Sequence, residues 1–288
     1  MEHGEDSKYS GIELPQWAVF GLWAVLIGCL IAELIHRLWG GYIPRDLSAY
    51  IAAAETFMAG GDPYTDDLKQ AATYRGYVYV YPPGTLPLVS VLDALGARVV
   101  SALDLLARSA VVLASLHWLR RRFSIEVPLC VLAVLALLYE PILVDFRAGN
   151  LPSYLVGAFL LCVHVSHEPG ERWHAPAVIL AGVALAFKPM WLVPAGLLLV
   201  VRRRWWLLGA LVAGASVVGG LTVVHLDLFP TWLERLDQLA ARYRNAVLLN
   251  VHVGAWVAAV ALWLAGLVVL IRRRGWDDEW LWLWLCVS

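Results

Sequence analysis

The chain has 288 residues, 60% of them hydrophobic, and a mean hydropathy of +0.67. These values, with apolar runs of about 20 residues, exclude an ordinary soluble domain and predict an all-α polytopic membrane protein. The formal net charge is −1, and we expect the lipid bilayer, but no nucleic acid, among its partners.

The placement of charge predicts an orientation in the membrane. Arginine triplets stand at 120–122, 202–204 and 272–274, each directly after an apolar run. By the positive-inside rule these positions are cytoplasmic, and the N-terminus is then cytoplasmic too. The Trp-, Arg- and Ala-rich composition is typical of a high-GC bacterium, so the expected location is a bacterial plasma (inner) membrane.

Apolar runs predict six spans and two irregular segments. The spans are expected near residues 15–35, 98–119, 127–144, 151–165, 207–224 and 253–271. The apolar run over residues 83–95 is short and is interrupted by proline, which favours a half-inserted helix that enters the membrane from outside. Residues 175–201 favour a broken hairpin with Lys188-Pro189 at its tip, because proline disrupts helices; the number of crossings at both segments stays open.

This topology gives one transmembrane domain, 1–288, with external segments 36–82, 139–150 and 225–252. The last external segment contains apolar residues at helical spacing, which predicts an amphipathic helix on the outer surface. At the chain's end, the apolar run from Trp280 stops after nine residues. Nine residues are too few for a span, so we expect a C-terminal truncation.

Asp46, in the long first external segment, is the first candidate for chemistry. A carboxylate at the mouth of a membrane bundle can take a proton from an attacking hydroxyl, as a general base does. Equally, Asp46 can cap a short helix over residues 47–58 that stops at Gly60-Gly61. The sequence leaves both interpretations open.

Other polar and aromatic residues of the external segments are candidates for binding substrate. Lys188 suits a phosphate, or it extends toward an interface. Asp145, Arg147 and Asn150 can clasp a sugar or a phosphate, or form a solvated corner with a local ion pair. Tyrosines can stack on sugars or anchor at the interface, and Asp62 chiefly predicts a turn.

A further basic cluster follows in the third external segment, where arginines can hold lipid headgroups or the phosphate of a lipid-linked sugar. The full set of candidate binding residues is Arg45, Tyr50, Asp62, Tyr64, Tyr81, Asp145, Arg147, Asn150, Lys188, Arg244, Asn250 and His252. The sequence contains no HxxxH, HExxH or DxD spacing, so we expect no metal and no cofactor.

Several of these motifs, in this order, resemble those of glycosyltransferase family 87. They are Arg45-Asp46-Leu47-Ser48-Ala49-Tyr50, Gly60-Gly61-Asp62-Pro63-Tyr64, Tyr81-Pro82-Pro83, the Gly149-Asn150 corner, Phe187-Lys188-Pro189 and Asn250. The chain departs from the family's pattern at Asn150, where Gln is usual, and at His252, where a small hydroxyl residue is usual.

The resemblance implies a GT-C membrane bundle whose first external loop carries the catalytic carboxylate, here Asp46. It also implies inverting transfer of mannose from a polyprenyl-phosphate donor to a glycolipid acceptor on the extracytoplasmic face. Two other functions stay open on the residues alone, a polytopic transporter or flippase and a non-catalytic membrane scaffold.

Overall fold

A computed structural model describes residues 14–64, 79–168 and 170–245, and every regular element in these ranges is a helix. The elements are α1 (Gln16–Trp39), α2 (Arg45–Met58), η1 (Pro83–Thr85), α4 (Leu86–Asp93), α5 (Ala97–Arg122), α6 (Leu129–Leu138), α7 (Glu140–Ala148), α8 (Pro152–His167), α9 (Glu171–Ala186), η2 (Pro189–Trp191), α10 (Leu192–Val201), α11 (Trp205–Val224), η3 (Leu226–Leu228) and α12 (Phe229–Asn245). The predicted all-α fold is confirmed.

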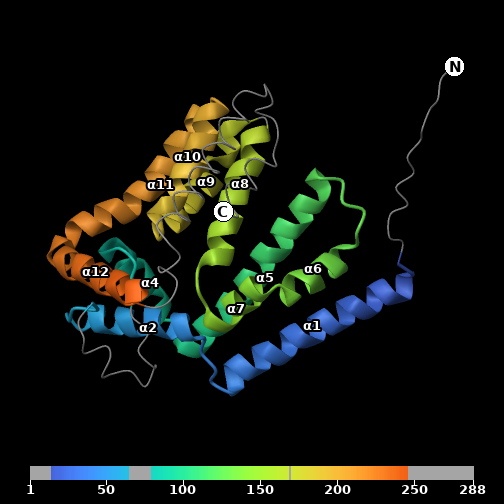
Figure 1. Cartoon of the computed structure of the whole chain (residues 1–288), viewed down its shortest axis with the longest axis horizontal. Helices are drawn as coiled ribbons and strands as arrows, with labels where there is room; N and C mark the ends of the chain where they lie inside the picture. Colours follow the sequence, from blue (N-terminus) through green and yellow to red (C-terminus); the bar gives the residue numbers. More distant parts are fainter. Residues whose placement is uncertain (1–13, 65–78, 169, 246–288) are drawn as a thin grey trace.

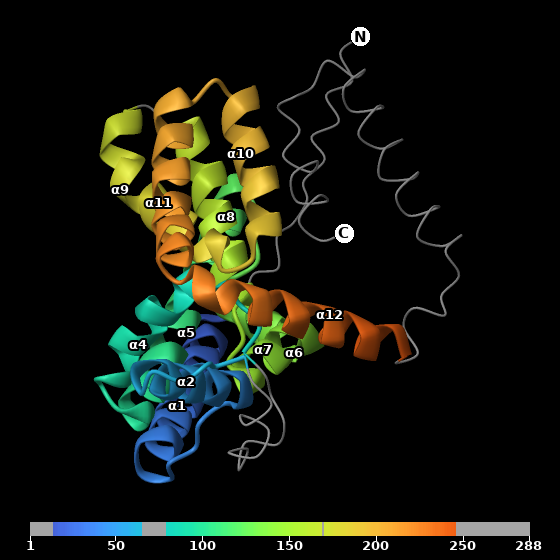
Figure 2. The ribbon, with the colours of Figure 1, turned by 90° about the vertical axis from the view of Figure 1, so that its left-hand side faces the viewer.

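The helices form two groups that meet along α5 and α8 (Figure 1). Helices α8, α9, α10 and α11 pack together as one group, and α1, α5 and α6 form the other. Figure 2 shows α12 crossing the foot of the first group, with α2 and α4 beyond it. Helix α2, from the segment 36–82 that the sequence predicts to be external, therefore lies where the two groups converge.

Among the described residues, three helices, α1, α5 and α11, are long and apolar enough to cross a membrane. The single span expected over residues 127–144 is wrong in shape, because α6 and α7 meet there at a 75° bend. Pro141 explains the break, since a continuous helix would drive its ring into the carbonyl four residues earlier. The predicted outer corner is consequently a helix, α7, rather than a loop.

The two irregular segments are short, as predicted. Residues 83–93 form η1 and the eight-residue α4, and residues 171–201 form α9 and α10. The break between α9 and α10 falls at Lys188, whose φ of −128° and ψ of 86° lie outside helical values. The hairpin broken at Lys188-Pro189 is therefore confirmed.

Side-chain contacts sort the helix ends into two sets. At one end, Trp118 Nε1 of α5 donates to His164 Nδ1 of α8 at 3.1 Å, and Arg204 Nε donates to the Ser166 carbonyl at 2.8 Å. At the other end, Arg37 of α1 donates to the carbonyl oxygens of Ser101 in α5 (2.9 Å) and of Phe146 in α7 (3.2 Å).

The arginine triplets 120–122 and 202–204 therefore share one end of the molecule, as predicted, and α2 lies at the opposite end. The expected span over 253–271, the triplet 272–274 and the chain's last residues lie outside the described ranges.

Candidate active site

Helix α2 places Asp46 at the junction of the two helix groups. The helix starts after Pro44 and ends before Gly60, whose φ of +75° suits glycine. It buries one face, including Leu47, Tyr50 and Ile51, in the aromatic core of this end. A short helix is thus present, but the alternative role of Asp46 as its cap is wrong, because the N-cap is Pro44, Asp46 lies inside the first turn, and no side chain caps the helix.

Asp46 is half-buried, and its carboxylate makes no hydrogen bond or ion pair within the described part of the chain. Burial raises the pKa of this carboxyl above its usual value, while the positive charges of Arg45 and Lys188 act in the opposite direction. A half-buried carboxylate without a fixed partner can accept a proton from an incoming hydroxyl.

The corner after α7 lies directly against the start of α2. Gly149 has a φ of +72°, and a Cβ there would lie 2.6 Å from the Pro44 Cβ and 3.1 Å from the Leu47 Cβ. Its N–H closes α7 by donating to the Asp145 carbonyl at 2.9 Å. Glycine is required here both for its left-handed conformation and for the close approach, and so Asn150 is brought beside α2.

Asn150 is held by tyrosines from two other segments. Its Oδ1 accepts hydrogen bonds from the hydroxyls of Tyr81 (3.1 Å) and Tyr50 (3.5 Å), and from the N–H of Leu151 (2.7 Å). The two hydroxyls lie 2.8 Å apart. Burial raises the pKa of Tyr81 to about 12 and raises that of Tyr50 well above its usual value, so both remain protonated donors. The Asn150 amide nitrogen has no partner among the described residues and is available to donate.

These tyrosines build the site rather than offer open faces to a sugar. Tyr50, Tyr79 and Tyr81 meet edge to face, with ring centroids 5.3 to 6.0 Å apart. All three are buried, so neither stacking on substrate nor anchoring at the interface describes them.

Lys188, at the break between α9 and α10, brings a positive charge to the same place. It is half-buried, and its Nζ lies 6.0 Å from the centroid of the Tyr81 ring. The ring of its neighbour Phe187 packs on Tyr81 at 5.9 Å. Its charge acts on Asp46, and its own segment holds it beside Tyr81. These contacts favour a role in the site over extension of the side chain toward the membrane interface.

Asp145 and Arg147 point to different surroundings, and the local ion pair between them does not form. Asp145 is buried, its Oδ2 accepting from Arg108 Nη1 at 2.7 Å, from the Ser153 N–H at 2.9 Å and from the Ser153 hydroxyl. Arg147 is exposed on the other side of α7, with Tyr42 donating to its carbonyl oxygen. Asp145 therefore fixes the corner from behind, and Arg147 remains accessible.

Sequence reasoning missed the charged network behind the corner. Arg108 donates to Asp104 at 2.7 Å, and Asp104 also accepts from Tyr154 (2.9 Å) and from Arg37 (3.4 Å). Ionisable residues inside an apolar span are costly, so they are usually paired. Asp104 and Arg108 lie four residues apart on one helix face, and this spacing could have indicated a buried ion pair.

Asp62, Tyr64 and Arg235 are structural in their described contacts. Asp62 Oδ1 accepts the Tyr64 N–H at 2.8 Å, which is the predicted turn. The Tyr64 hydroxyl donates to the Tyr81 carbonyl at 2.8 Å, and the Tyr64 carbonyl accepts from the buried Arg235 of α12 at 2.9 Å. The predicted amphipathic helix thus exists as α12, but its Arg235 faces the protein interior.

The remaining candidates cannot be placed. The side chain of Arg244, and Asn250 and His252 entirely, lie outside what the structure describes. Among the described residues no group of three or more His, Cys, Asp or Glu residues gathers in a way that suits a metal ion.

The helices define an all-α membrane protein with a carboxylate, an amide and a lysine converging at one end. The chain matches the sequence profile of glycosyltransferase family 87 over residues 79–288, which is more than half of its length. It therefore belongs to glycosyltransferase family 87 and is a membrane glycosyltransferase. The match begins at Tyr79, so that Asp46 lies outside it and Lys188 and Asn150 lie within it. Comparisons with curated proteins and with solved structures gave no match.

Proposed function

We propose that this glycosyltransferase moves mannose from a polyprenyl-phosphate donor to a glycolipid acceptor on the extracytoplasmic face, with inversion and with Asp46 as the general base. The observation that carries the proposal is the position of Asp46. It is a half-buried carboxylate without a hydrogen-bond partner among the described residues, close enough to Lys188 for the two charges to act on each other.

The geometry supplies a role for each group. Asp46 takes the proton of the acceptor hydroxyl as its oxygen bonds to the anomeric carbon. The bond from that carbon to the phosphate oxygen breaks, and the polyprenyl phosphate leaves with the electron pair. Lys188 neutralises the charge that grows on the phosphate, and the exposed side chains of Arg45 and Arg147 lie on the flanking helices to assist it.

Asn150 positions the sugar in this proposal. Its carbonyl oxygen is occupied by tyrosine hydroxyls, so its amide nitrogen donates to a hydroxyl of the sugar. A site that donates in a fixed direction favours a sugar whose hydroxyl stands there, which supplies selectivity among hexoses.

The arrangement of helix ends supports the extracytoplasmic side. Asp46 lies at the end of the molecule opposite the arginine triplets 120–122 and 202–204, which the positive-inside rule places in the cytoplasm. In a bacterial plasma membrane the N-terminus is then cytoplasmic as well.

The test is transfer of radiolabelled mannose from polyprenyl-phosphate-mannose to membrane lipids. We expect Asp46→Asn to reduce transfer by about 10²- to 10⁴-fold, the usual contribution of general-base catalysis. Glu55→Gln is the matched control, because Glu55 is an exposed carboxylate on the same helix, and its transfer should equal that of the wild type.

Equal transfer by Asp46→Asn at equal expression would refute the assignment of the base. Transfer by the wild type from a nucleotide sugar but not from the polyprenyl phosphate would refute the donor. Protection of Asp46→Cys from a membrane-impermeant thiol reagent added outside the cell would contradict the proposed side.

A further inference from the structure

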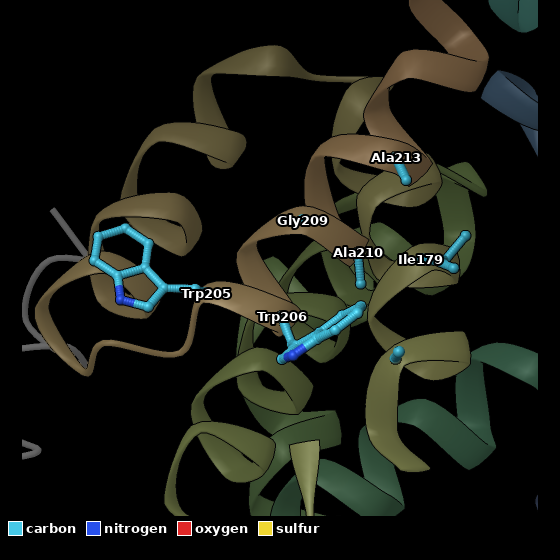
Figure 3. A pocket seen from close by; sticks show the side chains of 7 residues that line it. Ile179, Trp205, Trp206, Gly209, Ala210 and Ala213 are labelled. Carbon is cyan, nitrogen blue, oxygen red and sulfur yellow. The ribbon is translucent and has the colours of Figure 1, made fainter. Parts of the chain in front are cut away.

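An apolar groove lies between α9 and α11, far from Asp46. Its volume is about 400 Å³, and it is lined by Ala175 and Ile179 of α9 and by Trp205, Trp206, Gly209, Ala210 and Ala213 of α11 (Figure 3). The opposite end of α11 contacts η1, where Thr222 Oγ1 accepts the Gly84 N–H at 3.0 Å. At 1.5 Å per residue, Trp206 and Thr222 stand about 24 Å apart.

The groove exists because α9 and α11 touch at one level and leave room at another. A Cβ at Gly182 would lie 2.4 Å from the Leu211 carbonyl oxygen, and a Cβ at Gly214 would lie 2.0 Å from that of Ile179. The two backbones are therefore in contact at these glycines, as small residues allow in membrane helices. Nearer the start of α11, a Cβ at Gly209 would meet nothing within 4 Å.

The position of the groove on the molecule indicates a lipid as its occupant. Helix α11 is one of the candidate membrane spans by its length and composition, so we expect the walls of the groove to face hydrocarbon. Trp205 and Trp206 are each 61% exposed at its mouth, where tryptophan marks the membrane interface. In Figure 3 the Trp206 ring points across toward α9, below Ala210. An empty groove would lose dispersion contacts that an acyl chain restores.

Positive charge surrounds the same mouth. The Arg172 guanidinium lies 5.3 Å from the centroid of the Trp206 ring. Arg172, in the first turn of α9, and Arg203, two residues before the start of α11, are both exposed, and α11 begins without a side-chain cap. Arginine side chains and the free N–H groups of a helix start are the donors that a phosphate requires.

We propose that this groove binds an anionic glycerophospholipid. One acyl chain lies between α9 and α11 over Gly209 and Ala213, and the headgroup phosphate contacts Arg172 and Arg203. The site is separate from the proposed transfer reaction and lies at the other end of α11, so its test does not depend on activity.

The experiment measures lipid retained by the detergent-purified protein, by native mass spectrometry after incubation with phosphatidylglycerol or phosphatidylcholine. A Cβ at Gly209 meets open space, so the ring of Gly209→Phe should occupy the groove and lower retained phosphatidylglycerol about tenfold, a change of about 1.4 kcal/mol. Gly219→Phe is the matched control, because a Cβ at Gly219 also meets open space but lies outside the groove. It should retain lipid as the wild type does.

The arginines supply a second, independent test. Arg172→Gln and Arg203→Gln should each weaken phosphatidylglycerol retention about fivefold, as expected for one basic residue at an anionic surface. Retention of phosphatidylcholine should not change. Equal retention by Gly209→Phe and Gly219→Phe, or equal affinity of the wild type for the two lipids, would overturn the proposal. A monomer produced from a dimer by Gly209→Phe alone would instead assign the groove to a second copy of the chain.

Discussion

Arg108 and Asp145 form a buried ion pair between α5 and α7, with Nη1 and Oδ2 2.7 Å apart and side chains 0% and 3% exposed. The pair ties the corner that carries Asn150 to a membrane span. Asp145 also accepts from Ser153 at the start of α8, so three helices are joined behind the candidate site. Asp145 is therefore a positioning residue rather than one that touches substrate.

We expect Arg108→Met to destabilise the protein by about 3–5 kcal/mol, because Asp145 would be left as an uncompensated buried charge. The midpoint of thermal denaturation in detergent measures the effect. Asp145→Asn removes that charge, and the double variant Arg108→Met, Asp145→Asn should recover part of the loss, since the two positions are coupled. Additive losses in the double variant would show that the pair contributes little.

Gly149→Ala should both destabilise the protein and reduce sugar transfer. The left-handed conformation alone costs a residue with a Cβ about 1–2 kcal/mol, and the new Cβ would also press on Pro44 at 2.6 Å. Displacement of Pro44 moves Asp46 relative to Asn150, so kcat should fall more than KM rises.

Gly60→Ala separates these two effects. Gly60 has a φ of +75° but open space around a Cβ, so Gly60→Ala should show only the conformational cost in thermal denaturation, with transfer preserved. If both variants transfer sugar equally well, the contact between the corner and α2 has no role in the reaction.

The pH dependence of transfer should report the charge of Lys188. Asp46 must be ionised to act as a base, so kcat/KM falls as the pH drops through its raised pKa. Lys188 favours the ionised carboxylate, and Lys188→Met should therefore move the acidic limb of the profile to higher pH. Lys188→Arg keeps the charge and should leave the limb in place. A limb at the same pH in all three proteins would mean that Lys188 does not act on the base.

The sequence was sufficient for the features that rest on local chemistry. Apolar length predicted the spans now seen as α1, α5 and α11, and the Lys188-Pro189 dipeptide predicted the break between α9 and α10. Helix spacing predicted α12, and the arginine triplets 120–122 and 202–204 predicted which helix ends lie together. Each of these depends on neighbouring residues and on the membrane alone.

What the sequence did not predict depends on contacts between distant segments. Apolar composition alone did not show that the chain bends at Tyr139, and Pro141 was the missed signal. The residues next to Tyr50 in the sequence do not show whether its side chain forms hydrogen bonds inside the protein or stacks on a sugar. Its hydrogen-bonding partners are the distant residues Tyr81 and Asn150. Likewise a local ion pair with Arg147 was one of the two interpretations left open for Asp145, whereas its partner, Arg108, lies 37 residues away.

Asp46→Asn should raise the thermal stability of the protein at neutral pH while it strongly reduces transfer. The sign follows from the raised pKa of Asp46, which means that the fold binds its proton more tightly than the unfolded chain does. Stability linked to this group is present at low pH and is lost as the pH rises through the folded pKa. An ionised Asp46 therefore lowers the free energy of unfolding, and asparagine, which does not ionise, avoids this loss. Denaturation midpoints in detergent at neutral pH and at pH 4 measure this, and we expect a gain at neutral pH that shrinks at pH 4.

Glu55→Gln should gain nothing at either pH, since Glu55 is exposed. A loss of stability at neutral pH in Asp46→Asn would instead show that the carboxylate is held by favourable contacts and is a structural group of α2.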